Sequence, residues 1–483
     1  MDILPPQTTT LKIPTKDLNG FNLKSSLTTS KIFSPNLTEM LHEEEISRGV
    51  FTTDTLYPLF ISIFAKYKVS FLDLNTAIAY CIIPPIICTK LPSLHYIVYI
   101  KESLLMIYLD NSASTFVKPK EVIKAVNDAL VHYTANPGRS GHNASIKTAL
   151  KIEEAREKVA SHFNAESGQN VIWTHNCSQA LNLAILGSAK KGGHVVATEN
   201  EHNSVLRPLE HLKSQGIIDY SIASQTKEMG ITLDDIKKEV RPNTYMIVCN
   251  HISNVNGDKA DIKTIGKYCK ENNIIFLVDG AQSCGHTKID IKENNIDYLT
   301  VAGHKGFYAP QSIGCLVMND KYRPEPILFG GTGTNSLELV QPDIFPERLE
   351  SGTISTPLIL GLSAGIDFVE NNFQEINNKI DDLTTYLNYE LSKINIKIYT
   401  QPENAFGVFA FNIANHDSGE IANTLNSKYS ICVRGGFHCA PLKHKALGTL
   451  EQGAIRVSLS YFNSFSEIQK LIHAIKHIAK QKD

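Results

Sequence analysis

A lysine and an aspartate follow two apolar runs and could together hold a reactive organic cofactor. Asp279 ends the run Ile274–Val278, and Lys305 comes shortly after the run Tyr298–Val301. A lysine amine forms a Schiff base with an aldehyde, and a carboxylate keeps a pyridine nitrogen protonated so that the ring accepts electrons. Pyridoxal 5′-phosphate (PLP) needs both groups. The pair therefore predicts a PLP enzyme, although an exposed basic pair of His304 and Lys305 is the alternative.

A strand-to-helix turn upstream of this pair is a candidate phosphate site. The run Val171–Thr174 predicts a strand, and a helix is expected from Ser178 to Leu186. Backbone N–H groups at a helix start bind anions, and the Ser178 hydroxyl could add to them. The alternative is that Ser178 only caps the helix.

Three further polar residues are expected at the carboxyl ends of strands. His202 follows the run Val195–Thr198 and could stack on a planar ring and carry protons, or it could be a structural histidine. Asn254 follows the run Met246–Cys249, and Gln282 follows Asp279. Their amides could donate to the phenolic oxygen of the ring, although an asparagine in such a segment often only forms a turn.

A cysteine near the C-terminus is the candidate nucleophile. Cys439 has two glycines before it and a proline after it, which indicates a mobile loop. A thiol there could reach an external substrate, and a nearby cation would increase its reactivity. A metal site of His438, Cys439 and His444 lacks paired-ligand spacing, so no metal is expected. Arg456 could bind a substrate carboxylate with two hydrogen bonds or form a surface salt bridge.

The composition is that of a globular protein with a small-molecule or protein partner. The chain has 483 residues, 42% apolar and 20% charged, and a formal charge of −2. This balance argues against binding to nucleic acid or to an anionic membrane. The nine cysteines are scattered without a C-x-x-C pair, which favours a reducing compartment and a cytoplasmic location.

Residues 1–105 differ from the rest and are expected to form an N-terminal extension that is partly disordered. Their longest uncharged stretch, Leu74–Thr89, contains two prolines and is shorter than the roughly 20 residues of a spanning helix. No membrane span is therefore expected. The extension lacks an Arg-rich amphipathic signature, but organellar targeting stays open.

Strands and helices alternate from Met106 onward, which predicts an α/β fold with a mostly parallel sheet covered on both faces. A long helical pattern runs from Pro357 to Leu391, in one or two pieces. Beyond it an α+β texture predicts strands at 406–413 and 430–433 and helices at 419–427 and 466–480. We expect a large cofactor-binding domain at 106–370, whose first residues pack with the small domain, and a small domain carrying Cys439 at 371–483.

Together these residues resemble the class V aminotransferase family of PLP fold type I. Within it they are most similar to cysteine desulfurases, which are close to selenocysteine lyases. The resemblance runs from Ile107 to the C-terminus. It is carried by Glu201-His202, Ser253-Asn254-Val255, Asp279-Gly280-Ala281-Gln282, Gly303-His304-Lys305, Glu350-Ser351-Gly352-Thr353 and Arg434-Gly435-Gly436-Phe437-His438-Cys439-Ala440-Pro441. The chain departs from the commoner family pattern at Asn176–Gln179, Ala302 and Phe437.

The resemblance implies a seven-stranded sheet, a PLP site and a homodimer. Lys305, Cys439 and His202 would be catalytic. The cofactor would be bound by Lys305, Asp279, Gln282, Asn254, His202, Cys177, Ser178 and His304, with Cys177, Ser178 and His304 along the phosphate. Thr353 would reach the phosphate of the neighbouring subunit's cofactor. Arg456 would hold the substrate carboxylate, with Arg434 nearby.

The implied activity is conversion of L-cysteine to L-alanine. The sulfur would be held as a persulfide on Cys439 and passed to an acceptor protein, for example in iron–sulfur cluster assembly. One alternative is a selenocysteine lyase, or another PLP-dependent C–S lyase or aminotransferase. A second is a non-catalytic scaffold that keeps the fold.

Overall fold

The computed structural model describes residues 106–480, apart from 138–139, 227–229, 402–405 and 415. The predicted N-terminal extension, residues 1–105, and the expectations for it lie outside the described residues. In the described part, no helix is both long and apolar enough to cross a bilayer. The cysteines described there are free thiols.

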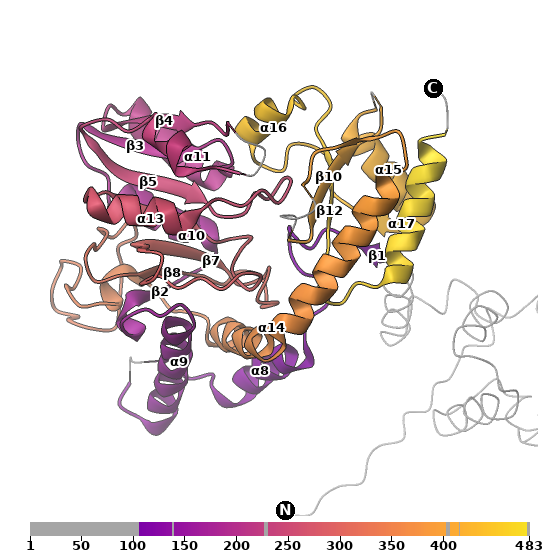
Figure 1. The fold of residues 1–483 in the computed structure, drawn as a ribbon. Helices are drawn as coiled ribbons and strands as arrows, with labels where there is room; N and C mark the ends of the chain where they lie inside the picture. The colour runs from indigo at the N-terminus through magenta and orange to yellow at the C-terminus, as the bar shows by residue number, and fades with distance from the viewer. Residues whose placement is uncertain (1–105, 138–139, 227–229, 402–405, 415, 481–483) are drawn as a thin grey trace, which may run out of the picture. The chain divides into compact units, whose positions relative to one another are not determined.

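The central element is a seven-stranded sheet, as predicted (Figure 1). Its order is β2-β8-β7-β6-β5-β3-β4, and every strand is parallel except β8, which runs antiparallel to both neighbours. The strands are β2 Val171–Thr174, β3 Gly193–Thr198, β4 Ile218–Ala223, β5 Thr244–Asn250, β6 Ile275–Asp279, β7 Tyr298–Ala302 and β8 Gly314–Met318.

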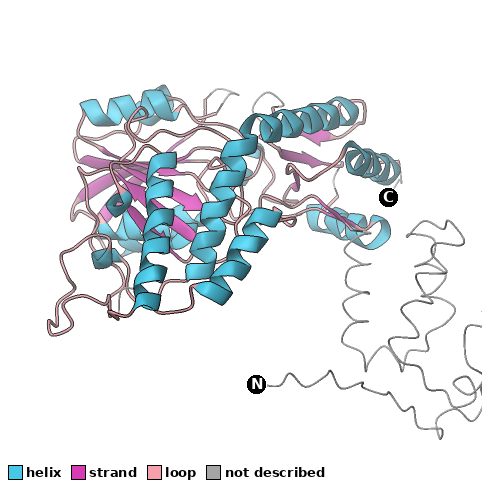
Figure 2. Ribbon diagram, turned by 90° about the horizontal axis from the view of Figure 1, so that it is seen from below, coloured by secondary structure: helices cyan, strands magenta, loops and turns pink. Residues whose placement is uncertain are grey.

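Helices cover both faces of this sheet because successive strand residues point to opposite sides. In β5, Ile247 packs with one buried cluster and Met246 with the other. The first cluster includes residues of α9 (Asn143–His162), α12 (Leu233–Lys237), α13 (Ile262–Glu271) and α14 (Thr356–Leu391); the second includes residues of α10 (Cys177–Gly187) and α11 (Asn203–Ser214). The views in Figures 1 and 2 show the resulting layers.

The C-terminal part forms a second core with its own sheets. An antiparallel sheet has the order β12-β10-β9, with β9 Lys397–Ile398, β10 Val408–Asn412 and β12 Ile455–Ser458. Residues of α15 (Ser418–Tyr429) and α17 (Phe465–Ile478) belong to this core, whereas α16 (Pro441–Leu447) lies on the side of the large sheet. Strand β1 (Ile107–Tyr108) pairs in parallel with β11 (Ile431–Cys432), so the start of the described chain packs with this part.

Helix α14 is a single helix of 36 residues that both cores share. Its first half contributes Ile359 and Leu362 to the core of the large sheet, and its second half contributes Leu383 and Leu387 to the C-terminal core. The predicted domain boundary at residue 370 lies inside this helix. The N-terminal end of α14 also packs against α8 (Lys120–His132), and from there the helix runs into the C-terminal part.

A glycine of α14 sets how closely this helix approaches the turn after Lys305. A Cβ atom at Gly365 would lie 2.0 Å from the carbonyl oxygen of Phe307. We expect Gly365→Ala to lower the free energy of unfolding by about 1–3 kcal/mol, because overpacking displaces helix or turn. Urea unfolding measures this change, with Asn371→Ala on the exposed side of the same helix as the control. Equal stability of Gly365→Ala and wild type would contradict the close contact.

Candidate active site

One cavity of about 220 Å³ gathers most of the predicted site residues. It opens where β5, β6 and β7 end, at the carboxyl edge of the large sheet, and residues of the C-terminal part close it. The predicted residues that line it are Cys177, Ser178, His202, Asn254, Asp279, Gln282, His304, Lys305, Arg434 and Arg456. Cys439 and Thr353 do not line it.

Lys305 borders this cavity and is otherwise surrounded by protein. Burial lowers its pKa, and the positive charges of Arg456 and Arg434 act in the same direction. Cys177 and Asp279 oppose this shift. The lowered pKa increases the fraction of neutral amine, which is the nucleophilic form.

Asp279 is a buried carboxylate whose hydrogen-bond partners are neutral. The residue is 2% exposed. Its Oδ1 accepts from the N–H of Ala281 (2.9 Å) and from the Cys177 thiol (3.7 Å), and its Oδ2 from Asn250 (3.5 Å). Among the described residues, none forms a direct ion pair with Asp279. A buried carboxylate without a cation is costly, and a protonated pyridine nitrogen would satisfy it. The site therefore fits PLP.

Cys177 lies at the aspartate end of the cavity. Its Sγ is 3.7 Å from Asp279 Oδ1 and 3.4 Å from the Thr300 hydroxyl. Burial, followed by the charge of Asp279, raises the pKa of this thiol well above its ordinary value. Cys177 is therefore a neutral donor beside the residue predicted for the ring nitrogen, and its polar contacts lie there and not with Ser178.

The start of α10 is capped by Asn176, whose side chain accepts from the N–H of Gln179 (2.9 Å). The alternative in which Ser178 only caps this helix is therefore wrong. The Ser178 hydroxyl instead contacts the Ser204 hydroxyl (2.6 Å). Cys177 and Ser178 of the first turn border the cavity. Backbone N–H groups in a first helical turn have no partner within the helix, so this end of the cavity suits an anion such as a phosphate.

His202 is at once a structural residue and a cavity residue. Its Nδ1 accepts from the backbone N–H of Ser204 (3.0 Å), which caps α11. Because Nδ1 accepts, the hydrogen of the neutral ring is on Nε2. Burial lowers the pKa of His202 to about 4, with Lys305 and Arg434 adding to the effect of burial and Asp279 opposing it. The ring is thus neutral near pH 7.

The two amides predicted near the phenolic oxygen already have protein partners. Asn254 donates to the carbonyl of His438 (2.7 Å), and Gln282 donates to the carbonyl of Ser112 (3.1 Å). Each side-chain amide has a second hydrogen, so one donor of each remains for a ligand.

His304 lies two residues after the end of β7 and has a neutral ring. Burial lowers its pKa to about 4, and the neighbouring charges of Lys305 and Lys118 act in the same direction. Its Nδ1 is buried and has no hydrogen-bond partner among the described residues. An unpaired ring nitrogen at the cavity is a further polar group that a bound ligand could satisfy.

Arg456, on β12, is buried and forms no surface salt bridge. It is 1% exposed, and its guanidinium donates to Asp110 (2.6 Å) and to the carbonyl of Asn254 (2.9 Å). The Nε–H has no partner among the described residues. Of the five N–H donors of an arginine, about three remain for a carboxylate. Arg434 lies beside Arg456 through backbone hydrogen bonds of 2.8 and 3.2 Å.

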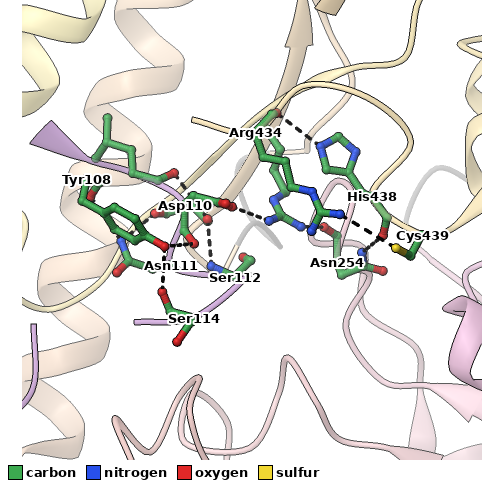
Figure 3. A network of polar contacts seen from close by, with 12 residues as sticks. Tyr108, Asp110, Asn111, Ser112, Ser114, Asn254, Arg434, His438 and Cys439 are labelled. Atoms are coloured by element: carbon green, nitrogen blue, oxygen red, sulfur yellow. Dashed lines mark hydrogen bonds and ion pairs between the residues drawn. The ribbon is translucent and has the colours of Figure 1, made fainter. Parts of the chain in front are cut away.

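Cys439 lies on a segment that is docked against the large core (Figure 3). His438 and Cys439 have φ angles of +49° and +57°. The carbonyl of His438 accepts from Asn254, and that of Cys439 accepts from the backbone N–H of Asn203 (2.7 Å). The guanidinium of Arg434 is 3.8 Å from Cys439 Sγ. Cys439 is half-buried, whereas its neighbour His438 is a fully buried residue.

Thr353 is exposed and lies away from the cavity in the described chain. The nearby Glu350 forms a buried bidentate pair with Arg156 (2.7 and 3.0 Å) and accepts from the N–H of Trp173 (2.6 Å). These contacts fix the start of the segment that carries Thr353. A contact of Thr353 with the cofactor phosphate of a neighbouring subunit stays a prediction.

Several cavity residues were missed by sequence reasoning, notably Asn250, Ser204 and Asn176. Asn250 had a signal, because it ends β5 just as Asp279 ends β6, and the two residues are register partners. Ser204 and Asn176 are common cap-region residues without such a signal. The described residues contain no group of three or more His, Cys, Asp or Glu side chains arranged for a metal.

Glu201 lies behind the cavity and is fully buried. Its Oε1 accepts from Thr198 (2.6 Å) and from the N–H of Asn250 (2.7 Å), whereas Oε2 has no partner among the described residues. Burial raises the pKa of Glu201 to about 8, and the charge of Asp279 adds to this. Glu201 is therefore mostly protonated at neutral pH.

A comparison with protein families matches residues 107–471 to the class V aminotransferases. The chain belongs to the class V aminotransferase family. Members of this family are PLP-dependent enzymes, and the expectation drawn from the motifs is confirmed. The chain is 33% identical to a probable cysteine desulfurase of Methanothermobacter thermautotrophicus, over 77% of this chain and 94% of that protein.

A second relative is similar to the chain in sequence, and a solved structure is similar to it in fold. A probable cysteine desulfurase of Pyrococcus abyssi is 33% identical over 78% of this chain and 94% of its own. The apo structure of a cysteine desulfurase from Thermococcus onnurineus superimposes with a TM-score of 0.72 at 29% identity, covering 82% of this chain and 98% of the other. The fold class is thus that of PLP-dependent enzymes of fold type I.

The proton on Glu201 predicts a pH-dependent effect of Glu201→Gln. The pKa of Glu201 is about 8 in the folded protein and has the ordinary value of 4.5 in the unfolded chain. This difference contributes stability that is fully present below pH 4.5 and is lost as the pH rises toward 8. Relative to Glu201→Gln, wild type should lose up to about 1.4 kcal/mol of unfolding free energy per pH unit over this range. Urea unfolding from pH 5 to 8 measures the difference. The exposed Glu121→Gln is the control, and parallel curves for Glu201→Gln and wild type would contradict the prediction.

Proposed function

We propose that this protein is a cysteine desulfurase that converts L-cysteine to L-alanine and holds the sulfur as a persulfide on Cys439. The observation that carries the proposal is the docking of the Cys439 segment at the cavity that contains Lys305 and Asp279. His438 and Arg434, which contact or flank Cys439, line that cavity themselves. The relatives named as probable cysteine desulfurases support it.

The cavity residues would hold PLP in the arrangement that the motifs predict. Lys305 Nζ would bind the aldehyde carbon, Asp279 the ring nitrogen, and His202 one face of the ring. The free amide hydrogens of Asn254 and Gln282 would donate hydrogen bonds to the phenolic oxygen, and the start of α10 would bind the phosphate. When bound, PLP supplies an aldehyde that captures amines and a ring that withdraws electrons from the adjacent carbon.

Arg456 and Lys305 would prepare L-cysteine for loss of its sulfur. The remaining N–H donors of Arg456 would bind the substrate carboxylate, as charge-assisted hydrogen bonds to carboxylates are strong. With the substrate amine in its place at the aldehyde carbon, Lys305 would be a free amine. Because burial lowers its pKa, its Nζ would accept the proton from the substrate Cα. His202 remains neutral and offers only its Nε2–H to the site.

Cys439 would then remove the sulfur by nucleophilic attack. Its Sγ bonds to the substrate sulfur as the C–S bond of the substrate breaks. The substrate Cβ takes up one of the two thiol protons, the substrate Cα takes back the proton held by Lys305, and alanine leaves. The second thiol hydrogen stays with the persulfide. A thiol of an acceptor protein would collect the outer sulfur by exchange. Iron–sulfur cluster assembly is the destination we propose.

A homodimer is supported by apolar side chains on the segment between β8 and α14. Six of them are exposed, and two are almost fully so. They are Leu328, Phe329, Leu337, Leu339, Val340 and Ile344. Large exposed apolar patches on a soluble protein commonly mark interfaces. The same segment leads to Thr353, which we propose reaches the phosphate of the neighbouring subunit's cofactor.

Replacing the nucleophile tests the persulfide route. Cys439→Ser should lower alanine release from L-cysteine on the order of 100-fold or more, because no thiol remains to accept the sulfur. The absorbance of bound PLP should persist, since Cys439 does not line the cavity. Cys432→Ser, which changes another partly exposed thiol, is the matched control. Undiminished alanine release by Cys439→Ser would exclude the route.

The same assay separates the alternative substrates. Rates with L-cysteine, L-selenocysteine and cysteine sulfinate are compared for wild type and Cys439→Ser. A reaction with L-selenocysteine alone that does not need Cys439 would favour a selenocysteine lyase. Protein that stays colourless with added PLP would favour the non-catalytic scaffold.

Charges on the exposed apolar segment test the dimer. The double substitution Leu337→Asp and Leu339→Asp should convert a dimer to monomers, because burying carboxylates in an interface is costly. Analytical ultracentrifugation measures the change in mass. Tyr389→Asp, at an exposed position of α14, is the control and should stay dimeric. A monomeric wild-type protein would contradict the proposed assembly.

A further inference from the structure

A buried ion pair outside the catalytic cavity joins α16 to the large core. Lys443 Nζ lies 2.7 Å from Asp258 Oδ2, and the two side chains are 3% and 5% exposed. Lys443 also donates to the side-chain carbonyl of Gln225 (3.2 Å). No motif of the sequence points to either member of the pair.

Each member of the ion pair is close to the Cys439 segment, one along the chain and one across the contact with the large core. Lys443 lies on α16, which begins two residues after Cys439. Asp258 lies on the turn that carries Asn254, which is closed by the hydrogen bond from Ser253 N–H to the Asp258 carbonyl (2.9 Å). One turn of the large core therefore holds the segment at two points, through Asn254 on the His438 carbonyl and through Asp258 on Lys443.

The segment and α16 are also joined to each other. The rings of His438 and His444 stack at 5.3 Å, and His438 Nδ1 is 3.1 Å from His444 Nε2. His444 Nδ1 in turn contacts the Thr449 hydroxyl (2.7 Å). Because His444 follows Lys443 directly, the ion pair that places α16 also places His438 and Cys439.

The backbone at Cys439 needs such external support. The left-handed conformation is unfavourable for a residue with a side chain, and His438 and Cys439 both adopt it in succession. Strained backbone persists only where the surroundings hold it in place. The strained pair is therefore expected to relax when its contacts with the large core are lost.

The chemistry of the pair suits a role in positioning more than one in stability. A buried ion pair contributes little net stability against apolar replacement, because the desolvation of both charges offsets their attraction. Lys443 and Asp258 also border a polar cavity of about 490 Å³, which is large enough for several waters. Water there can solvate the two charges when they separate, so the contact can open without isolating an ion.

We propose that the Lys443–Asp258 ion pair positions Cys439, by docking the segment 436–443 against the turn of Asn254 and Asp258. The docking follows from the contacts alone. Only its consequence for sulfur transfer rests on the proposed desulfurase function.

Loss of the pair should release Cys439. In the full-length, PLP-loaded protein, Lys443→Met removes the charge and keeps most of the side-chain volume. Alkylation of Cys439 by iodoacetamide, followed by peptide mass spectrometry with Cys432 as the internal reference, should become several-fold faster. The kcat for alanine release should fall about tenfold or more, as expected for a misplaced nucleophile, whereas the KM for L-cysteine should stay within about twofold.

Three companion variants make the outcome decisive. Lys443→Arg should restore slow alkylation and turnover, because its guanidinium can still pair with Asp258. Lys445→Met, on the exposed face of the same helix, should behave as wild type. The double variant Asp258→Asn with Lys443→Met leaves no buried charge unpaired, so it decides the matter if the single variant does not fold.

Wild-type alkylation and turnover in Lys443→Met or in the double variant would overturn the proposal. Faster alkylation that Lys443→Arg does not reverse would also overturn it, because the effect would then come from packing alone. The alkylation measurement does not need desulfurase activity. A wild-type protein that releases no alanine would therefore contradict the proposed function. The alkylation rates of Cys439 would still test its docking.

Discussion

The site is organised around one buried negative charge at the end of a central strand. Asp279 is the only carboxylate among the described residues that line the cavity. Its strand, β6, lies in the middle of the sheet between β5 and β7. Because neighbouring parallel strands end at the same edge, Asn250 and Lys305 are brought to the same place. Burial keeps the other ionisable groups around it mostly neutral.

Burial sets the protonation of the neighbouring residues. Burial makes Glu201 mostly protonated, Cys177 a neutral thiol and His202 a neutral imidazole, so none competes with Asp279 for a cation. The donors that reach Asp279 are all uncharged. A positively charged ring nitrogen is consequently the partner that this arrangement favours most.

The second constraint is the contact between the two cores. One turn after β5 receives Arg456 from the C-terminal part, through the carbonyl of Asn254, and it also holds the Cys439 segment. Strand β1 and helix α14 tie the same two cores together by backbone pairing and apolar packing. The nucleophile and the cofactor residues come from opposite sides of this contact, so chemistry that needs both depends on it.

Local pattern was enough to predict the central strands and several of the site residues that end or follow them, although Asn250 at the end of β5 was missed. An apolar run that ends in a polar residue, such as Asp279, is visible in the chain because buried parallel strands are continuously apolar. The edge strand β4 was missed because two polar residues, Asp219 and Ser221, alternate with its apolar ones, and its inner residues are only partly buried. The long helix at 356–391 was predicted, but not that it is continuous and shared by two cores.

The sequence by itself therefore determined the fold class, the family, and the identity of most cavity residues, since these depend on residue types at short spacing. Only the tertiary structure decided how those residues are used. Arg456 has two partners inside the protein, Asn254 already donates to His438, and Cys439 is held in a strained, docked conformation. The physical reason is that burial, protonation and docking depend on segments far apart in the chain. Lys443 and Asp258, 185 residues apart, meet only when the two cores close.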